Sequence, residues 1–264
     1  MILISGYHAE QINKYLLTEL ERGILQKKEK SPVTYRYDST ETLVFELKMR
    51  TRIVESAKAL DASHASFTTF KNSRCNEKFW SRTENGGFQL KSGVLPSDAV
   101  SDIFHNGRLY GFECATAIVI VLYKAILDSI HKEPFNVFFK DLLLWDWNYD
   151  SDLRLISTDN KDEAYPGDVL YFKNPDYAPE TPQWQGENAV MLADDLYYGH
   201  GIGIKSSEKM ISSLNSKRKP GSTTSAYLFN QVVHPDFEYI RKLSAGRTPS
   251  ERPIVAQIGR YTYM

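Results

Sequence analysis

The segment GFECATAIVIVLY, residues 111–123, decides the fold that the sequence predicts. It places a carboxylate and a thiol, Glu113 and Cys114, at the start of an apolar run. That run continues to Leu127 and is longer than most strands, so it favours a helix buried on every face, although its β-branched residues are also compatible with a strand. Cys114 is then either a small core residue or a nucleophile on the first turn of a helix.

The rest of the chain predicts a mixed architecture around this helix. An amphipathic helix is expected over residues 39–63 and a short helix over 96–106, with irregular structure or a hairpin between them. Short apolar runs that favour strands occupy residues 142–147, 168–172, 188–193 and 196–200, and a basic connection with a short helix follows over 205–230. A buried helix followed by antiparallel strands indicates an α+β fold. We expect one domain over residues 1–231 and a peripheral or partly flexible C-terminal extension over 232–264.

Composition argues against several classes of protein. The 264 residues are 42% hydrophobic and 25% charged, and the formal net charge of -1 gives no reason to expect nucleic acid or an anionic membrane as a partner. The N-terminus lacks the features of a signal peptide, and the longest apolar run falls short of the roughly 20 residues of a spanning helix. The two cysteines, Cys75 and Cys114, form neither a disulfide framework nor a zinc motif. We therefore expect an intracellular protein without a metal or other cofactor.

A reactive Cys114 needs help from a base. The start of a helix stabilises an anion by only about 0.3–1 kcal/mol. Lowering the thiol pKa of about 8.5 by two units requires about 3 kcal/mol, so a partner must supply the remaining stabilisation of the thiolate. Glu113 acts in one of two ways: its charge raises the pKa of the thiol, or it accepts the proton of the thiol.

A second segment, residues 183–203, offers candidate partners for the thiol. If Asp194–Asp195 is the turn of a hairpin, Ala189 lies opposite His200, and Glu187 shares a sheet face with His200. A carboxylate and an imidazole on that face, below a helix that carries a thiol, would form a nucleophile and base. Glycines on both sides of His200 allow another group to approach the backbone closely. The alternative is that Glu187 is a solvated carboxylate and His200 a hydrogen-bonded histidine at a strand end.

Several blocks of this sequence match one family. They are FELKMR at 45–50, GFECATAIVIV at 111–121, GDVLYFKNP at 167–175, QWQGEN at 183–188, GHGIGI at 199–204, LNSKRKPG at 214–221 and SAYL at 225–228. With these blocks the chain resembles the Bacillus spore-associated transglutaminases, protein-glutamine gamma-glutamyltransferases that cross-link coat proteins. The resemblance implies an α+β core like that of the NlpC/P60 and papain-like cysteine enzymes, with the catalytic domain over residues 1–231.

The resemblance also implies roles for individual residues. Cys114 is expected to be the nucleophile and Glu187 its partner, with Glu113 as an auxiliary or substitute and His200 as a supporting residue. NlpC/P60 enzymes have a catalytic histidine where this chain has Glu187, which argues against a plain Cys–His peptidase. The residues expected to bind substrate are Phe67, Trp147, Tyr171, Trp184 and Asn188, of which the aromatic ones match a family tunnel.

The expected reaction is the formation of isopeptide bonds between glutamine and lysine side chains of spore coat proteins, with release of ammonia. The absence of acidic residues at calcium-loop spacing predicts that calcium is not required. We expect a monomer that is made in the cytoplasm of the sporulating mother cell and becomes associated with the spore coat. The alternatives are an NlpC/P60-type peptidase or amidase that acts on cell-wall peptides, and a coat scaffold that has lost its chemistry. The intact set of Cys114, Glu187 and His200 argues against the scaffold.

Overall fold

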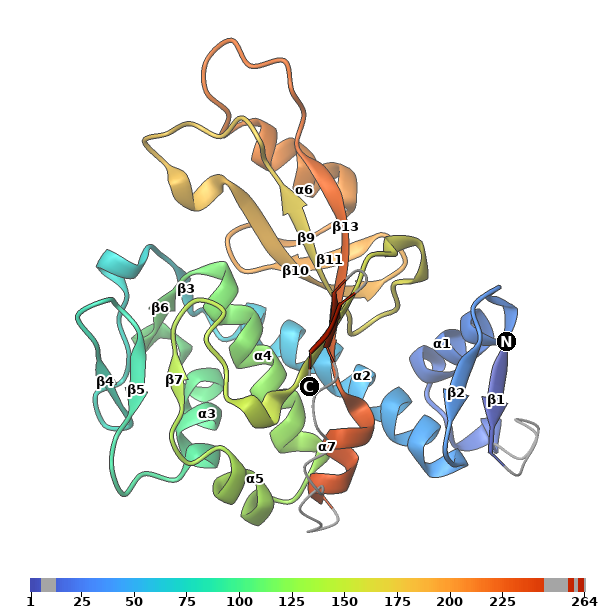
Figure 1. Ribbon diagram of the computed structural model, residues 1–264. Coiled ribbons are helices and arrows are strands. Elements are labelled where there is room, and N and C mark those ends of the chain that lie inside the picture. Colours follow the sequence, from blue (N-terminus) through green and yellow to red (C-terminus); the bar gives the residue numbers. More distant parts are fainter. Residues whose placement is uncertain (6–12, 245–255, 259–260, 264) are drawn as a thin grey trace.

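A helix on a sheet forms the centre of the computed structural model, which describes residues 1–5, 13–244, 256–258 and 261–263. The buried helix α4 lies against a six-stranded antiparallel sheet (Figure 1). Other helices cover both layers, and three strands form a small separate sheet beside α4. The predicted α+β class is confirmed.

The helices are α1 (Glu19–Lys30), α2 (Thr40–Ala62), α3 (Pro96–His105), α4 (Cys114–Ser129), α5 (Lys132–Phe138), α6 (Ser207–Asn215) and α7 (Phe237–Ser244). The strands are β1 (Ile2–Ile4), β2 (Tyr35–Tyr37), β3 (Ser66–Phe67), β4 (Trp80–Arg82), β5 (Phe88–Leu90), β6 (Gly111–Phe112), β7 (Leu143–Leu144), β8 (Leu155–Thr158), β9 (Val169–Lys173), β10 (Gly186–Ala193), β11 (Leu196–Gly199), β12 (Gly203–Lys205), β13 (Tyr227–Pro235), β14 (Ala256–Ile258) and β15 (Tyr261–Tyr263). Short 3-10 helices span Lys14–Leu16, Phe70–Asn72, Gly107–Leu109, Ser151–Leu153, Lys161–Glu163 and Pro182–Trp184.

The predicted central helix is confirmed and begins at Cys114. Every residue of α4 except Lys124, Asp128 and Ser129 is buried, because α2, α3 and β10 all pack against it. The predicted helix over 39–63 is confirmed as α2, whose first turn is capped by a hydrogen bond from the backbone N–H of Thr42 to the hydroxyl of Ser39.

The central sheet has the strand order β12-β11-β10-β9-β13-β8. Val190 and Tyr198 pack on one face with α2 and α4, while Phe172 and Ala189 pack on the other face with α6. Each face buries alternate residues of the same strands, as the pleat of a sheet requires. This arrangement brings β10 against α4, with Asn188 of β10 beside Cys114 at the start of the helix.

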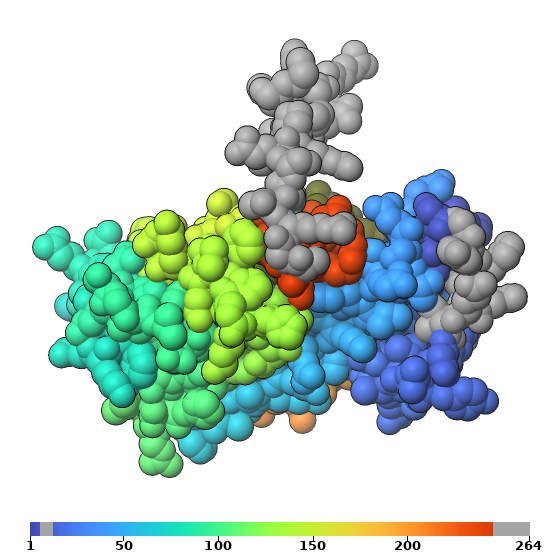
Figure 2. Space-filling view, turned by 90° about the horizontal axis from the view of Figure 1, so that it is seen from below, coloured from blue at the N-terminus to red at the C-terminus, as the bar shows by residue number. Residues whose placement is uncertain are grey.

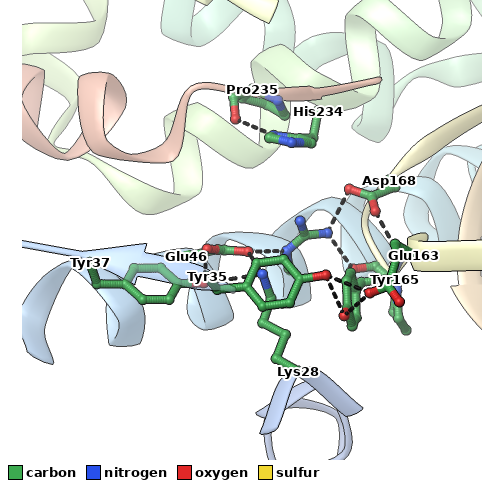
Figure 3. Close-up of polar contacts among 11 residues, drawn as sticks. Lys28, Tyr35, Tyr37, Glu46, Glu163, Tyr165, Asp168, His234 and Pro235 are labelled. Atoms are coloured by element: carbon green, nitrogen blue, oxygen red, sulfur yellow. Dashed lines mark hydrogen bonds and ion pairs between the residues drawn. The ribbon is translucent and has the colours of Figure 1, made fainter. Parts of the chain in front are cut away.

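A buried group of charged side chains joins the N-terminal part of the chain to the sheet (Figure 3). Arg50 on α2 donates from Nε to Glu46 Oε1 at 2.7 Å and from Nη1 to Asp168 Oδ1 at 2.6 Å. Lys28 on α1 lies 2.8 Å from the same Glu46 oxygen. All four side chains are buried. The FELKMR and GDVLYF blocks therefore meet as one ion network that links α1, α2 and the start of β9.

All four expected strands differ from the structure in their bounds, the one over 168–172 only by a shift of one residue to β9. Only Leu143–Leu144 of the range 142–147 is a strand, and it pairs with β5 outside the central sheet. The chain then turns at Asp146, which has a left-handed backbone with φ 50°. β11 ends at Gly199, one residue before the expected end, and β10 begins two residues early, at Gly186. The range 205–230 contains the predicted short helix, α6, and also the start of β13, which the sequence analysis missed.

The segment 232–244 differs from the peripheral extension expected there. β13 runs to Pro235 and lies between β8 and β9, and α7 buries Phe237, Ile240 and Leu243 against α2. Figure 2 shows the orange-red surface of α7 set between the green middle of the chain and its blue N-terminal part. An apolar stripe at helical spacing explains this packing. Residues 245–255, 259–260 and 264 lie outside the described residues, and the extension stays a prediction there.

Candidate active site

Cys114 is the first residue of α4 and is 7% exposed. Its sulfur accepts a hydrogen bond from Asn188 Nδ2 on β10 at 3.6 Å. Burial raises the pKa of the thiol far above its usual range, and the charge of Glu187 raises it further. The thiol is therefore protonated at rest, and a base must take its proton during attack on a substrate.

Glu187 on β10 is fully buried. Its Oε1 accepts a hydrogen bond from the backbone N–H of Gly201 at 3.1 Å, and its Oε2 has no hydrogen-bond partner among the described residues. Burial raises the pKa of Glu187 to about 8. A carboxyl with that pKa holds and releases a proton near neutral pH, as general acid–base catalysis requires.

Two glycines make room for the Glu187 carboxylate. A methyl group on Gly199 would lie 2.7 Å from Glu187 Cγ, and one on Gly201 would lie 3.1 Å from Glu187 Oε2. The second position also lies 3.2 Å from the ring edges of both Phe67 and Trp184. The free carboxylate oxygen and these two aromatic rings thus converge on one point. The close approach expected beside these glycines is present.

The expected register of the β10–β11 hairpin is wrong. The two-residue turn forms as predicted, since Ala193 pairs with Leu196. A bulge in β10 then shifts the register by one residue, and Ala189 pairs with Gly199 instead of His200. One inserted residue moves side chains to the other face of a strand, so simple alternation from the turn fails here.

His200 lies just beyond β11, in an aromatic setting. Its ring stacks on Phe112 with the centroids 4.6 Å apart, and its Nδ1 lies 3.0 Å from the hydroxyl of Tyr198. Burial lowers the pKa of His200 to about 4, so the ring is neutral near pH 7. Among the described residues, no hydrogen bond joins the imidazole to Cys114 or Glu187. Its position fits a supporting residue better than a base.

Glu113 precedes α4 at the N-cap position, and its side chain makes no capping hydrogen bond. Burial and then the charge of Asp146 raise the pKa of Glu113 to about 6. A second carboxyl that titrates near neutrality therefore lies beside the thiol. This environment is compatible with the auxiliary role expected for it.

The residues expected to bind substrate fall into two groups. Trp147, Tyr171 and Asn188 line a cavity of about 530 Å³. Phe67 and Trp184 pack together beside Glu187, with their ring centroids 5.0 Å apart. Asn188 links the cavity to the nucleophile through its bond to the sulfur.

The family model described as protein-glutamine gamma-glutamyltransferase matches residues 1–244. The chain belongs to this family. A transglutaminase of Halalkalibacterium halodurans is 48% identical over 224 residues, which cover 85% of this chain and 78% of the relative. One from Bacillus pumilus is 42% identical over 245 residues, covering 92% of this chain and 99% of the relative.

A solved transglutaminase has the same fold. The structure titled "Transglutaminase from Geobacillus stearothermophilus (without C-terminal extension)" matches with a TM-score of 0.75 and 50% identity, covering 78% of this chain and 98% of that one. The resemblance to the transglutaminases is thus confirmed, together with the papain-like α+β fold and the enzyme class of an acyltransferase that acts on protein glutamine. Protein substrates follow from that class.

One charged residue in the cavity lining of this transglutaminase was not among the candidates. This residue is Asp146, the only charged one in the lining among the residues that the structure describes. The available signal was an acidic residue inside the aromatic run WDWNY, residues 145–149, which the sequence analysis treated as the end of a strand.

Over residues 1–5, 13–244, 256–258 and 261–263, no three His, Cys, Asp or Glu side chains are grouped so that they could hold a metal ion. None of the helices in this part of the transglutaminase is both long enough and apolar enough to cross a membrane.

Proposed function

We propose that this chain joins glutamine and lysine side chains of proteins through a thioester on Cys114, with Glu187 as the base. Cys114 attacks the γ-carboxamide of a glutamine, and the backbone N–H groups in the first turn of α4 hold the oxyanion. Glu187 accepts the thiol proton and returns it to the leaving nitrogen, so that ammonia departs and the thioester forms.

In the second half of the proposed reaction, a lysine ε-amine attacks the thioester. Glu187 accepts a proton from the amine and passes it to the sulfur, which leaves as a thiol. The product is an Nε-(γ-glutamyl)lysine isopeptide bond, and the enzyme regains its starting protonation. Glu113 is proposed as an auxiliary carboxyl for the same proton transfers.

The observation that carries this proposal is a fully buried carboxyl, that of Glu187, next in the chain to Asn188, whose side chain donates to the sulfur of Cys114. Burial also raises the pKa of Glu187 to about 8. A carboxyl that ionises near neutral pH is suited to accepting a proton from a thiol and returning it to a leaving group. The raised pKa of Cys114 agrees with a nucleophile that ionises only as it attacks. The aromatic side chains around both residues support a site that excludes water from the thioester and favours a neutral amine.

The biological setting is also part of the proposal. We expect the substrates to be spore coat proteins, and the enzyme to be a monomer that is made in the mother cell and becomes associated with the coat. Calcium is not required in this proposal. The matching sequence blocks and the Bacillus relatives support this setting.

The test offers the purified protein a fluorescent primary amine and a glutamine-bearing protein, in the presence of a chelator. Incorporation is expected in the wild type and lost in Cys114→Ala. Cys75→Ala is the matched control, because Cys75 is a half-exposed thiol outside the site whose pKa burial raises to about 11. Incorporation that survives in Cys114→Ala would refute the nucleophile, and peptide cleavage without incorporation would favour a hydrolase.

A pair of variants tests the base. Glu187→Gln is expected to abolish formation of the acyl-enzyme, whereas His200→Ala is expected to reduce it less. The acyl-enzyme is followed by mass spectrometry of the intact protein. Loss in His200→Ala alone would show that the imidazole, and not the carboxylate, is the base.

A further inference from the structure

Among the described residues, the wall of the cavity of about 530 Å³ contains one charged side chain, and the others are aromatic, aliphatic or polar without charge. Trp147, Tyr149 and Tyr171 contribute aromatic surface, and Asp146 contributes the charge. Asn188, also in the wall, donates to the sulfur of Cys114, so the cavity adjoins the reacting atom.

The backbone holds Asp146 firmly at this place. Its N–H donates to Thr116 Oγ1 at 3.0 Å, which fixes the loop to the first turn of α4. Its φ of 50° is left-handed, a conformation that aspartate and asparagine tolerate better than most residues. Asp146 is exposed, and among the described residues its carboxylate takes part in no hydrogen bond or ion pair. The negative charge is therefore available to a ligand.

We infer that Asp146 binds the ε-ammonium group of the lysine that accepts the acyl group. This inference rests on the proposed function and assigns the cavity to the amine substrate. A lysine side chain is an apolar stem with a cationic tip, and aromatic faces together with one carboxylate complement both parts. The glutamine substrate carries no charge and gains nothing from Asp146.

Binding at Asp146 precedes the chemical step. The ammonium ion meets the carboxylate at the cavity wall, where Asp146 is exposed to solvent. It must lose a proton before it can attack, and the aromatic surroundings favour the neutral amine. Asp146 is thus a residue for substrate selection, which raises the local concentration of cationic amines relative to neutral nucleophiles and water.

The test is a competition between two nucleophiles for one acyl-enzyme. A glutamine-bearing protein is supplied with a cationic alkylamine and with hydroxylamine, which is uncharged at neutral pH, and the two products are counted by mass spectrometry. The product ratio is expected to fall about three- to tenfold in Asp146→Asn and further in Asp146→Lys. High salt is expected to lower the wild-type ratio towards that of Asp146→Asn.

Asp141→Asn is the matched control, since Asp141 is an exposed acid just before β7 that does not line the cavity. Its product ratio is expected to equal that of the wild type. A merely structural role for Asp146 would reduce both products together and leave their ratio unchanged, and that result would overturn the inference. Absence of both products in the wild type would instead overturn the proposed function itself.

Discussion

Replacement of Arg50 by methionine is expected to destabilise the protein strongly. The side chain is 2% exposed and bonds two carboxylates, those of Glu46 and Asp168, which are 6% and 1% exposed. Methionine fills a similar volume but provides no charge. Two buried carboxylates then lose a cationic partner, although Lys28 still pairs with Glu46.

The expected loss follows from the class of interaction. Removal of one partner from a buried ion pair costs about 3–5 kcal/mol, because the remaining charge is left uncompensated. At roughly 2–4 °C per kcal/mol for a chain of this size, the thermal midpoint should fall by about 6–20 °C.

The loss should also depend on pH. Burial acts to raise the pKa of Glu46, but the charges of Lys28 and Arg50 outweigh it and hold that pKa well below its usual range. A depressed carboxylate pKa stabilises the fold above the unfolded pKa of about 4.3, and the contribution is lost as the pH falls below it. The difference between wild type and Arg50→Met should therefore shrink below about pH 4.

Thermal unfolding and urea unfolding, both followed by circular dichroism, measure these differences. Arg52→Met is the matched control on the same helix, because Arg52 pairs with Glu55 at the surface, where the two side chains are 50% and 54% exposed. It is expected to cost under about 1 kcal/mol. Equal losses in the two arginine variants would refute the reasoning that burial makes the Arg50 network indispensable.

Three shorter predictions concern the site. Gly199→Ala places a methyl group 2.7 Å from Glu187 Cγ, so the rate of amine incorporation should fall by about 100-fold. Gly23→Ala is the control, because no atom lies within 4 Å of its added methyl group, and it should leave the rate unchanged. Equal rates in the two variants would contradict the packing argument. The kcat/KM for incorporation should rise with pH through about 8, because Glu187 must be ionised to act as a base, and a flat profile would exclude it. Asn188→Ala removes a hydrogen bond that favours the thiolate, so alkylation of Cys114 by iodoacetamide should slow by about three- to tenfold; an unchanged rate would show that the bond is unimportant.

Local patterns predicted the helices α2, α3, α4 and α6, whereas no helix was predicted where α1, α5 and α7 lie. The apolar run after Cys114 and the periodic residues of α2 are determined by nearby sequence, and both helices form at the expected places. The stripe of Phe237, Ile240 and Leu243 carried the same kind of signal. Its charged neighbours led to the expectation of a peripheral tail, although an amphipathic helix needs charges on its outer face.

The geometry of the site depended on features that local sequence does not reveal. The bulge in β10 shifts the register, so counting alternate residues from the turn does not put Glu187 and His200 on one face of the sheet. Both residues nevertheless lie near Phe67. The cavity is made by segments that are distant in the sequence, such as those of Asp146 and Asn188. Their proximity follows only from the packed structure.

The position of β13 also bears on when the enzyme acquires its cavity during synthesis. Gln231 and Val233 of this strand form part of the wall, whereas Cys114 lies more than 100 residues earlier in the chain. A nascent chain that ends before β13 therefore carries the thiol without a complete cavity for the amine. Since domains fold as they emerge from the ribosome, the cavity should become complete only after β13 has been made.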